Sequence, residues 1–427
     1  DERNADVTID LDSTQRITPM GLAAFVSLLF LYSLASRRLE RTIVTAPIVF
    51  TVAGMLMFPA LPEIQRAGVD RSILLHLAEI GLVLLLFTDA SCTNLSVLRS
   101  VGNLPVRLLS IGMLLTILLG AVAARLLFPR LSIWEAGILA AILAPTDAGL
   151  GQVIVKSPRV PMRIRQGLNV EAGLNDGLSV PFLLFFIALA AAGSEGLGAS
   201  LTQFIVEQLG FGVVVGLGIG LVGGWLLGLA RRKASIAESF EQIGAVTLPL
   251  LCLIASEMVG ASMFIAAFVA GLAVQIGFKE AGKHSVEFAE EWGQMLNLSV
   301  FFLFGMLVVR AWPQFSLTTV LYAILSLTVV RMLPVAIALI GMRLSKSTVL
   351  FMGWFGPRGL ASIVLGLVYL EQEKHLPGET TIRLAVMMTV LLSIFAHGLS
   401  ARPCIGLYAR KIASLDPASP EHQEFKV

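Results

Sequence analysis

Residues 138–155 read ILAAILAPTDAGLGQVIV, and residues 349–367 read VLFMGWFGPRGLASIVLGL. Each stretch is apolar and long enough to span a membrane, but a proline and a charged residue interrupt its middle. The charged residue is Asp147 in the first stretch and Arg358 in the second. Paired interrupted helices at matching positions are typical of transporters in which both breaks contribute to a binding site at the membrane midplane.

The composition around these stretches is that of a membrane protein. Hydrophobic residues make up 56% of the 427 residues, and charged residues only 14%, against about 25% in soluble proteins. Thirteen apolar segments of about 20 residues centre near positions 27, 51, 81, 116, 144, 179, 216, 248, 270, 299, 329, 358 and 394. We therefore predict an all-α integral membrane protein with about 13 transmembrane helices. Spans 1–6 and 8–13 then form two inverted six-helix repeats, whose broken helices, spans 5 and 12, cross.

The distribution of basic residues predicts the orientation of the chain. Lys and Arg are about twice as numerous in the connections that contain Arg37, Lys156 and Arg402 as in the alternate connections, and such an excess marks the cytoplasmic side. We therefore predict an N-terminus outside the cell and a C-terminus in the cytoplasm, with the protein in the plasma membrane.

Several function classes are disfavoured by what the sequence lacks. A net charge of +2 from 31 basic and 29 acidic residues gives no reason to expect a nucleic-acid partner. The three cysteines have no CxxC spacing, so no metal cage or disulfide framework is indicated, and we expect no cofactor. The chain has no GxxxxGK[ST] motif for a nucleotide-driven pump. It also has no nucleophile–base motif of an enzyme and no repeated filter of a cation channel.

Five ionisable residues lie deep within the predicted spans, where each costs at least ~2.5 kcal/mol and usually has a function. They are Asp147, Glu171, Asp176, Arg331 and Arg358. Three acids against two bases leave one carboxylate without a fixed partner. Such a group becomes neutral by taking up a proton or a metal cation, which is the chemistry of exchange.

Span 6 contains the polar stretch NVEAGLNDGLSVPF, residues 169–182. Glu171 and Asn175 are four residues apart and share a helix face, whereas Asp176 lies about 140° around the helix from Glu171. The two acids therefore have different neighbours. Hard monovalent cations prefer oxygen ligands, which carboxylates, the Thr146 hydroxyl and unwound backbone carbonyls can supply.

At these residues the sequence resembles the monovalent cation:proton antiporter superfamily, and specifically its electroneutral sodium/proton exchanger branch. The resemblance covers nearly the whole chain. It rests on the Thr146-Asp147 break, the Glu171-x-x-x-Asn175-Asp176 segment, Arg331 in span 11 and the Pro357-Arg358-Gly359 break. Each string alone is a weak signal, but their order along these helices is specific.

The resemblance implies that Asp176 carries both the cation and the proton. Asp147 and Thr146 then complete the site for the transported Na+ ion, and Asn175 caps or orients it. Because the electrogenic branch has Asp in place of Asn175, the resemblance implies one-for-one exchange of Na+, or Li+, for H+. Many relatives have Ser where this chain has Ala172, and the missing hydroxyl makes K+/H+ exchange the alternative.

The resemblance also implies a structural ion pair between Glu171 and Arg331 that bridges spans 6 and 11. Arg358 is the alternative partner of Glu171 and lies among the freed helix ends at the crossing.

The same resemblance divides the chain into functional parts and implies a homodimer formed through spans 1 and 7. We predict scaffold and dimerisation helices in residues 1–94 and 193–311, core helices in residues 95–192 and 312–410, and a short cytoplasmic tail in residues 411–427. Glycine recurs at every fourth position of span 7, from Gly212 to Gly228, and small residues allow close helix contact. We interpret this glycine stripe as an internal packing surface, with a dimer seam as the alternative.

Overall fold

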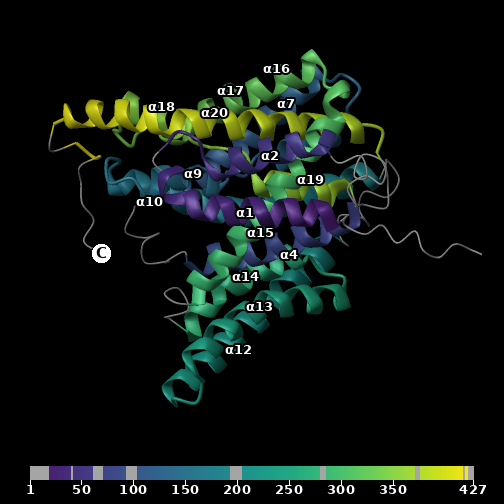
Figure 1. Ribbon diagram of the computed structural model, residues 1–427, viewed down its shortest axis with the longest axis vertical. Helices are drawn as coiled ribbons and strands as arrows, with labels where there is room; N and C mark the ends of the chain where they lie inside the picture. The colour runs from purple at the N-terminus through teal and green to yellow at the C-terminus, as the bar shows by residue number, and fades with distance from the viewer. Residues whose placement is uncertain are drawn as a thin grey trace, which may run out of the picture.

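The computed structural model describes residues 19–39, 42–60, 71–92, 103–192, 204–278, 285–370, 376–416 and 419–421. Within these ranges all regular secondary structure is helical (Figure 1). Eight described helical segments are long and apolar enough to cross a membrane, and four shorter apolar helices accompany them. The prediction of an all-helical integral membrane protein is confirmed. The number of crossings and the inverted relation of the two halves stay predictions.

The first half of the chain contains α1 (Pro19–Leu39), α2 (Ala46–Ala60), α4 (Arg71–Cys92), α6 (Asn103–Arg107), α7 (Met113–Leu127), α8 (Ile133–Ile142), α9 (Ala148–Val155) and α10 (Met162–Ala192). The second half contains α12 (Gly212–Arg232), α13 (Glu238–Val259), α14 (Met263–Gly277), α15 (Ser285–Ala311), α16 (Leu317–Leu327), α17 (Val329–Ala338), α18 (Lys346–Trp354), α19 (Leu360–Leu370) and α20 (Glu379–Ala413). Two π-helical segments, η1 (Leu108–Gly112) and η2 (Phe204–Phe211), precede α7 and α12, and the short 3-10 helix η3 (Trp312–Gln314) follows α15. A helix or a helix break lies at each of the thirteen predicted centres.

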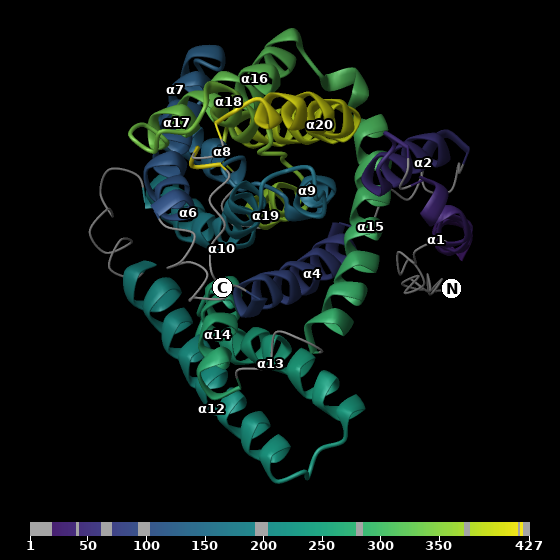
Figure 2. The same cartoon turned by 90° about the vertical axis from the view of Figure 1, so that its left-hand side faces the viewer.

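The helices pack as two groups. In one group α12 packs on α13 and α14, α14 packs on α4, and α15 packs on α2 and α4. In the other group α8 packs on α7 and α10, α16 packs on α20, and α17 packs on α18. Figure 2 shows α12, α13 and α14 at one end of the molecule and α7, α16, α18 and α20 at the other, with α4 and α15 between them. The assignment of these groups to scaffold and core stays a prediction.

The glycine stripe of α12 lies against α14. A side chain at Gly216, Gly220 or Gly224 would collide with backbone carbonyl groups of α14. Only glycine allows the two backbones to approach this closely. The stripe is therefore an internal packing surface, and the alternative of a dimer seam is wrong for these glycines.

The two predicted breaks face each other. The fifth span is interrupted between α8 and α9, and the twelfth span between α18 and α19. Each unwound segment contains a proline, which has no backbone N–H to continue a helix. The backbone N–H of Asp147 donates to the carbonyl of Pro357 at 2.8 Å, so the two unwound segments touch. This contact brings the adjoining ends of α8, α9, α18 and α19 together at the crossing.

The C-terminal tail folds back onto the helices. The Glu421 carboxylate accepts hydrogen bonds from the backbone N–H of Ser345 at 2.7 Å and from the Thr348 hydroxyl at 2.9 Å. Arg163, near the start of α10, donates to the carbonyl of Pro420 at 3.0 Å. Residues 420 and 421 therefore join the N-terminal ends of α10 and α18.

We expect Glu421→Ala to lower the free energy of unfolding by about 1.5–3 kcal/mol, the range for hydrogen bonds to a charged group. Burial raises the pKa of Glu421, but the hydrogen bonds from Ser345 and Thr348 outweigh this effect and hold the pKa below its usual value. The contribution is therefore complete at neutral pH and is lost as the pH falls through the lowered pKa. Melting temperatures of the wild type and of Glu421→Ala, compared from neutral to acidic pH, measure this contribution. A difference in melting temperature that does not change with pH would contradict the stabilising role of the ionised Glu421 carboxylate.

Candidate functional site

Asp147 holds the first turns of two half-helices. Its Oδ1 accepts the backbone N–H of Leu150 in α9 at 2.9 Å, and its Oδ2 accepts that of Leu360 in α19 at 2.6 Å. A helix N-terminus carries partial positive charge and favours an anion. The buried Asp147 carboxylate therefore joins the two breaks and is stabilised as an anion by both. Gly359 is required here, because a side chain at this position would collide with the carboxylate.

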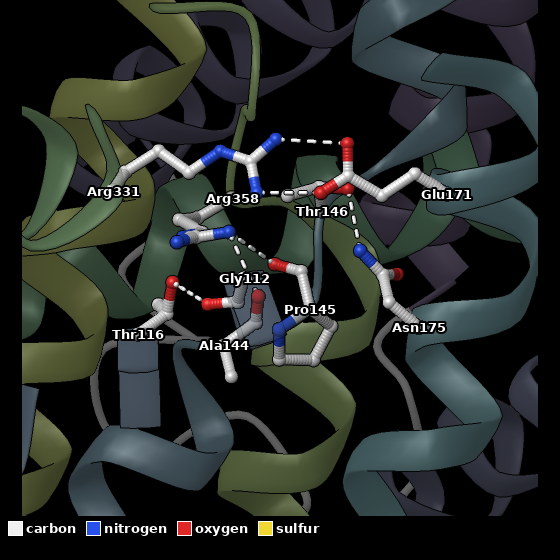
Figure 3. Close-up of polar contacts among 9 residues, drawn as sticks. All are labelled: Gly112, Thr116, Ala144, Pro145, Thr146, Glu171, Asn175, Arg331 and Arg358. Carbon is white, nitrogen blue, oxygen red and sulfur yellow. Dashed lines mark hydrogen bonds and ion pairs between the residues drawn. The ribbon is translucent and has the colours of Figure 1, made fainter. Parts of the chain in front are cut away.

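Arg358 binds the C-terminal end of the first half-helix, α8. Its Nη1 donates to the carbonyls of Ala144 and Pro145, both at 2.9 Å, just beyond the C-terminal end of α8 (Figure 3). The C-terminal end of a helix carries partial negative charge and favours a cation. At the end of α18, a ring nitrogen of His397 lies 2.9 Å from the Trp354 carbonyl. The C-terminal ends of α8 and α18 at the crossing therefore have a hydrogen-bonding side chain, Arg358 or His397, at their free carbonyls.

Glu171 pairs with Arg331, not with Arg358. The two nitrogens Nη1 and Nη2 of Arg331 donate to Oε1 and Oε2 of Glu171 at 2.6 and 2.9 Å (Figure 3). Both side chains are buried, and they join α17 to α10. A two-point contact between a guanidinium and a carboxylate is among the strongest hydrogen-bonded arrangements. The charges of Glu171 and Arg331 therefore cancel within a fixed pair.

Asp176 lies on the next turn of α10 and has no such partner. Its side chain is buried, and its Oδ1 makes no hydrogen bond within the described part of the chain. The neighbouring Asn175 donates to the Thr146 hydroxyl at 2.6 Å, which ties α10 to the first break. Of the three predicted acids, Asp176 is thus the one that neither an ion pair nor two helix ends hold.

Asp147 and Asp176 line one cavity of about 460 Å³. The exposed Lys156 and Arg402 also line it, so the cavity reaches the surface on the side that we predict to be cytoplasmic. Thr146, Asn175, Glu171, Arg331 and Arg358 are not among its lining residues. Thr146 and Asn175 directly precede the two lining aspartates in the sequence.

Sequence reasoning missed two lining residues that bear on ion binding, Asp89 and Asn297. Asp89 of α4 lines the cavity and lies beside Gly173 of α10, so the predicted set of five ionisable residues was incomplete. Asn297 of α15 also lines the cavity, and its Oδ1 is buried without a hydrogen bond in the described ranges. An acid in the apolar run before Cys92 was the available signal for Asp89. Asp89 lies close to the end of α4, where charged side chains often extend to the interface, so its position in the sequence alone does not mark it as a site residue.

The cavity combines carboxylate and amide oxygens, the ligand type that hard cations prefer. Among the described residues, no three His, Cys, Asp or Glu side chains converge as a ready-made metal cage. Asp89, Asp147 and Asp176 share the cavity without closing around one point.

Broken helices that meet beside buried carboxylates and a cavity that reaches one surface are typical of secondary transporters. The profile of the sodium/hydrogen exchanger transmembrane family matches residues 24–405, and the chain belongs to this family.

Curated relatives and a solved structure agree with this assignment. The chain is 29% identical over 277 residues to a probable Na+/H+ antiporter of Schizosaccharomyces pombe, which covers 58% of the chain and 35% of the relative. It is 28% identical over 281 residues to the K+/H+ antiporter NhaP2 of Shewanella sp. strain ANA-3, with coverages of 62% and 46%. The chain thus matches between a third and a half of the length of these relatives. The sodium proton antiporter MjNhaP1 of Methanocaldococcus jannaschii has the same fold, with a TM-score of 0.69 and 21% identity over 89% of this chain and 98% of that chain.

Proposed function

We propose that this protein is a secondary active antiporter that exchanges a monovalent cation, Na+ or Li+, for H+. One observation carries the proposal: Asp176 is buried at a cavity shared with Asp147, and one of its carboxylate oxygens accepts no hydrogen bond in the described part of the chain. A buried carboxylate without a partner is neutralised either by a proton or by a cation. The two therefore compete for the same group.

The cation takes its ligands from oxygens at the cavity. Asp176 and Asp147 supply carboxylate oxygens, and the free Oδ1 of Asn297 supplies an amide oxygen. In this proposal Asp147 keeps one protonation state throughout the cycle, with its carboxylate accepting the N–H groups of two helix N-termini. Thr146 acts indirectly, since the hydrogen bond from Asn175 holds the first break in position against α10. Only Asp176 changes its bound proton during the cycle.

This division of roles makes the exchange electroneutral. Glu171 and Arg331 cancel in every state, Asp147 keeps its charge, and Asn175 adds none. Asp176 carries either one cation or one proton across the membrane. The net charge moved in a complete cycle is therefore zero.

The remaining features of the proposal rest on the distribution of basic residues and on the family resemblance. The protein lies in the plasma membrane with its N-terminus outside, works as a homodimer and contributes to pH homeostasis. The cavity then opens to the cytoplasm, so the described conformation is the inward-open state of an alternating-access cycle. The lipid bilayer, monovalent cations and protons are its partners, and no catalytic reaction or bound cofactor is involved.

The second candidate is K+/H+ exchange at the same site. Ala172, directly after Glu171, lacks the hydroxyl that many relatives have at this position, and a site with fewer ligands favours the larger ion. A K+/H+ antiporter among the relatives supports this candidate as well. The two candidates differ only in the cation.

We expect proteoliposomes with an internal pH dye to show proton movement on addition of Na+ or Li+ and much less with K+. With Na+ as the substrate, a K+ diffusion potential set by valinomycin should leave the rate unchanged. Moving one net charge is worth about 2.3 kcal/mol per 100 mV, so an electrogenic cycle would respond visibly. Proton movement with K+ alone would establish K+/H+ exchange. A proton flux that is faster with one polarity of the potential would contradict electroneutrality. The absence of proton movement with any of the three cations would contradict antiport.

A further inference from the structure

A second cavity lies apart from the ion site, between α15, α19 and α20. Its volume is about 400 Å³, and most of its lining side chains are apolar. Arg310, near the end of α15, and Arg383, in the first turns of α20, line it together. Both arginines lie on the side that we predict to face outward. No acidic side chain is among the lining residues that the structure describes.

Two polar atoms at this cavity lack hydrogen-bond partners. Tyr369 is only 4% exposed, and its hydroxyl makes no hydrogen bond in the described part of the chain. The Nε of Arg383 is likewise buried without a partner there. Arg383 uses Nη2 to bind Oε1 of Gln314 at 3.2 Å, which holds its guanidinium at the cavity. Buried polar groups are nearly always paired, so these two require a ligand or water.

We propose that this cavity binds one anionic phospholipid. The phosphate accepts hydrogen bonds from Arg310, from Nε of Arg383 and from the Tyr369 hydroxyl, and the acyl chain fills the apolar part. Guanidinium groups match the geometry of a phosphate group and bind it through paired hydrogen bonds. The volume lies within the ~300–1,000 Å³ of ordinary ligand sites. Two acids, Glu135 and Glu379, lie near Tyr369 but do not line the cavity. The Glu135 carboxylate accepts the N–H groups of Ser132 and Gly378.

The position of the cavity gives the lipid a regulatory effect, and this second step rests on the proposed function. α15 belongs to the predicted scaffold, whereas α19 and α20 belong to the predicted core. Alternating access moves one such bundle against the other. A lipid that contacts both bundles stabilises the described state and slows exchange.

Binding is tested on the purified full chain by native mass spectrometry and thermal melting with added phosphatidylglycerol, with phosphatidylcholine as the neutral lipid. We expect phosphatidylglycerol to be retained and to raise the melting temperature. Arg310→Gln with Arg383→Gln should weaken its binding about ten- to thirtyfold. Arg130→Gln is the matched control, because Arg130 is exposed at the same end of the molecule outside the cavity. Leu307→Trp, which fills the apolar part and keeps both arginines, should weaken binding too.

Equal retention of phosphatidylglycerol by the wild type and the double glutamine variant would overturn the site. So would unchanged binding by Leu307→Trp, or an equal stabilisation by inorganic phosphate, which would show a simple anion site. The regulatory step is tested in phosphatidylcholine vesicles with and without phosphatidylglycerol, where the lipid should slow Na+-driven proton flux only when both arginines are present. Lipid binding without an effect on flux overturns regulation alone, and absence of flux in all vesicles overturns the proposed function while the binding result stands.

Discussion

Asp176→Asn is expected to abolish exchange of Na+, Li+ and K+ while the protein stays folded. Asparagine has nearly the shape of aspartate, but it neither releases a proton nor balances the charge of a cation. No ion pair holds the buried Asp176 within the residues that the structure describes, so its loss of charge leaves no opposite charge there uncompensated. Proton flux in proteoliposomes should fall to the level of empty vesicles, with an unchanged melting temperature.

The matched control for this variant is Asp416→Asn. It makes the same chemical change at an exposed position after α20, away from the cavity. We expect wild-type flux from this protein. Cation-dependent flux at the wild-type rate in Asp176→Asn would remove Asp176 from the carrier role and shift attention to Asp147 or Asp89.

Arg331→Ala is expected to lower the free energy of unfolding by about 3–5 kcal/mol, because removing one member of a buried pair leaves the other uncompensated. Arg331 contacts both oxygens of Glu171 at 2.6 and 2.9 Å, and the pair joins α17 to α10. Glu171→Gln should lose a comparable amount. Both variants should also lose exchange, since α10 carries Asp176. Thermal melting of the purified proteins separates this structural loss from the loss in Asp176→Asn.

A double variant sharpens this test. Glu171→Gln combined with Arg331→Met removes both charges together, and replacement of a whole buried pair by uncharged side chains is often nearly neutral. We expect the double variant to be more stable than Arg331→Ala. A melting temperature of Arg331→Ala equal to that of the wild type would show that the pair contributes nothing to the fold.

The broken helices could be predicted because their cause is local. A proline removes a backbone donor wherever it stands, and an ionisable residue beside it inside an apolar run marks a functional break. The sharing of Asp147 between α9 and α19 could not be predicted in this way. It depends on a contact between residues more than two hundred positions apart, at Asp147 and Leu360.

The ion-pair partner of Glu171 and the residues that line the ion cavity were harder to predict than the helix breaks, because they depend on contacts between distant parts of the sequence. Periodicity places Glu171 on a helix face but does not say whether Arg331 or Arg358 reaches it. That choice is made by the approach of α17 to α10 and by the backbone carbonyls that occupy Arg358. Asp89 and Asn297 come from α4 and α15, and they join the ion cavity only through packing between the two groups of helices.

Competition between one cation and one proton at Asp176 is the central claim, and the protons released on cation binding test it most directly. Isothermal titration calorimetry of the purified protein with Na+, repeated in buffers of different ionisation enthalpy at one pH, counts these protons. At a pH where Asp176 is protonated before Na+ is added, we predict the release of one proton for each Na+ bound, and no release by Asp176→Asn. Binding of Na+ without proton release, or equal release by Asp176→Asn, would contradict the claim.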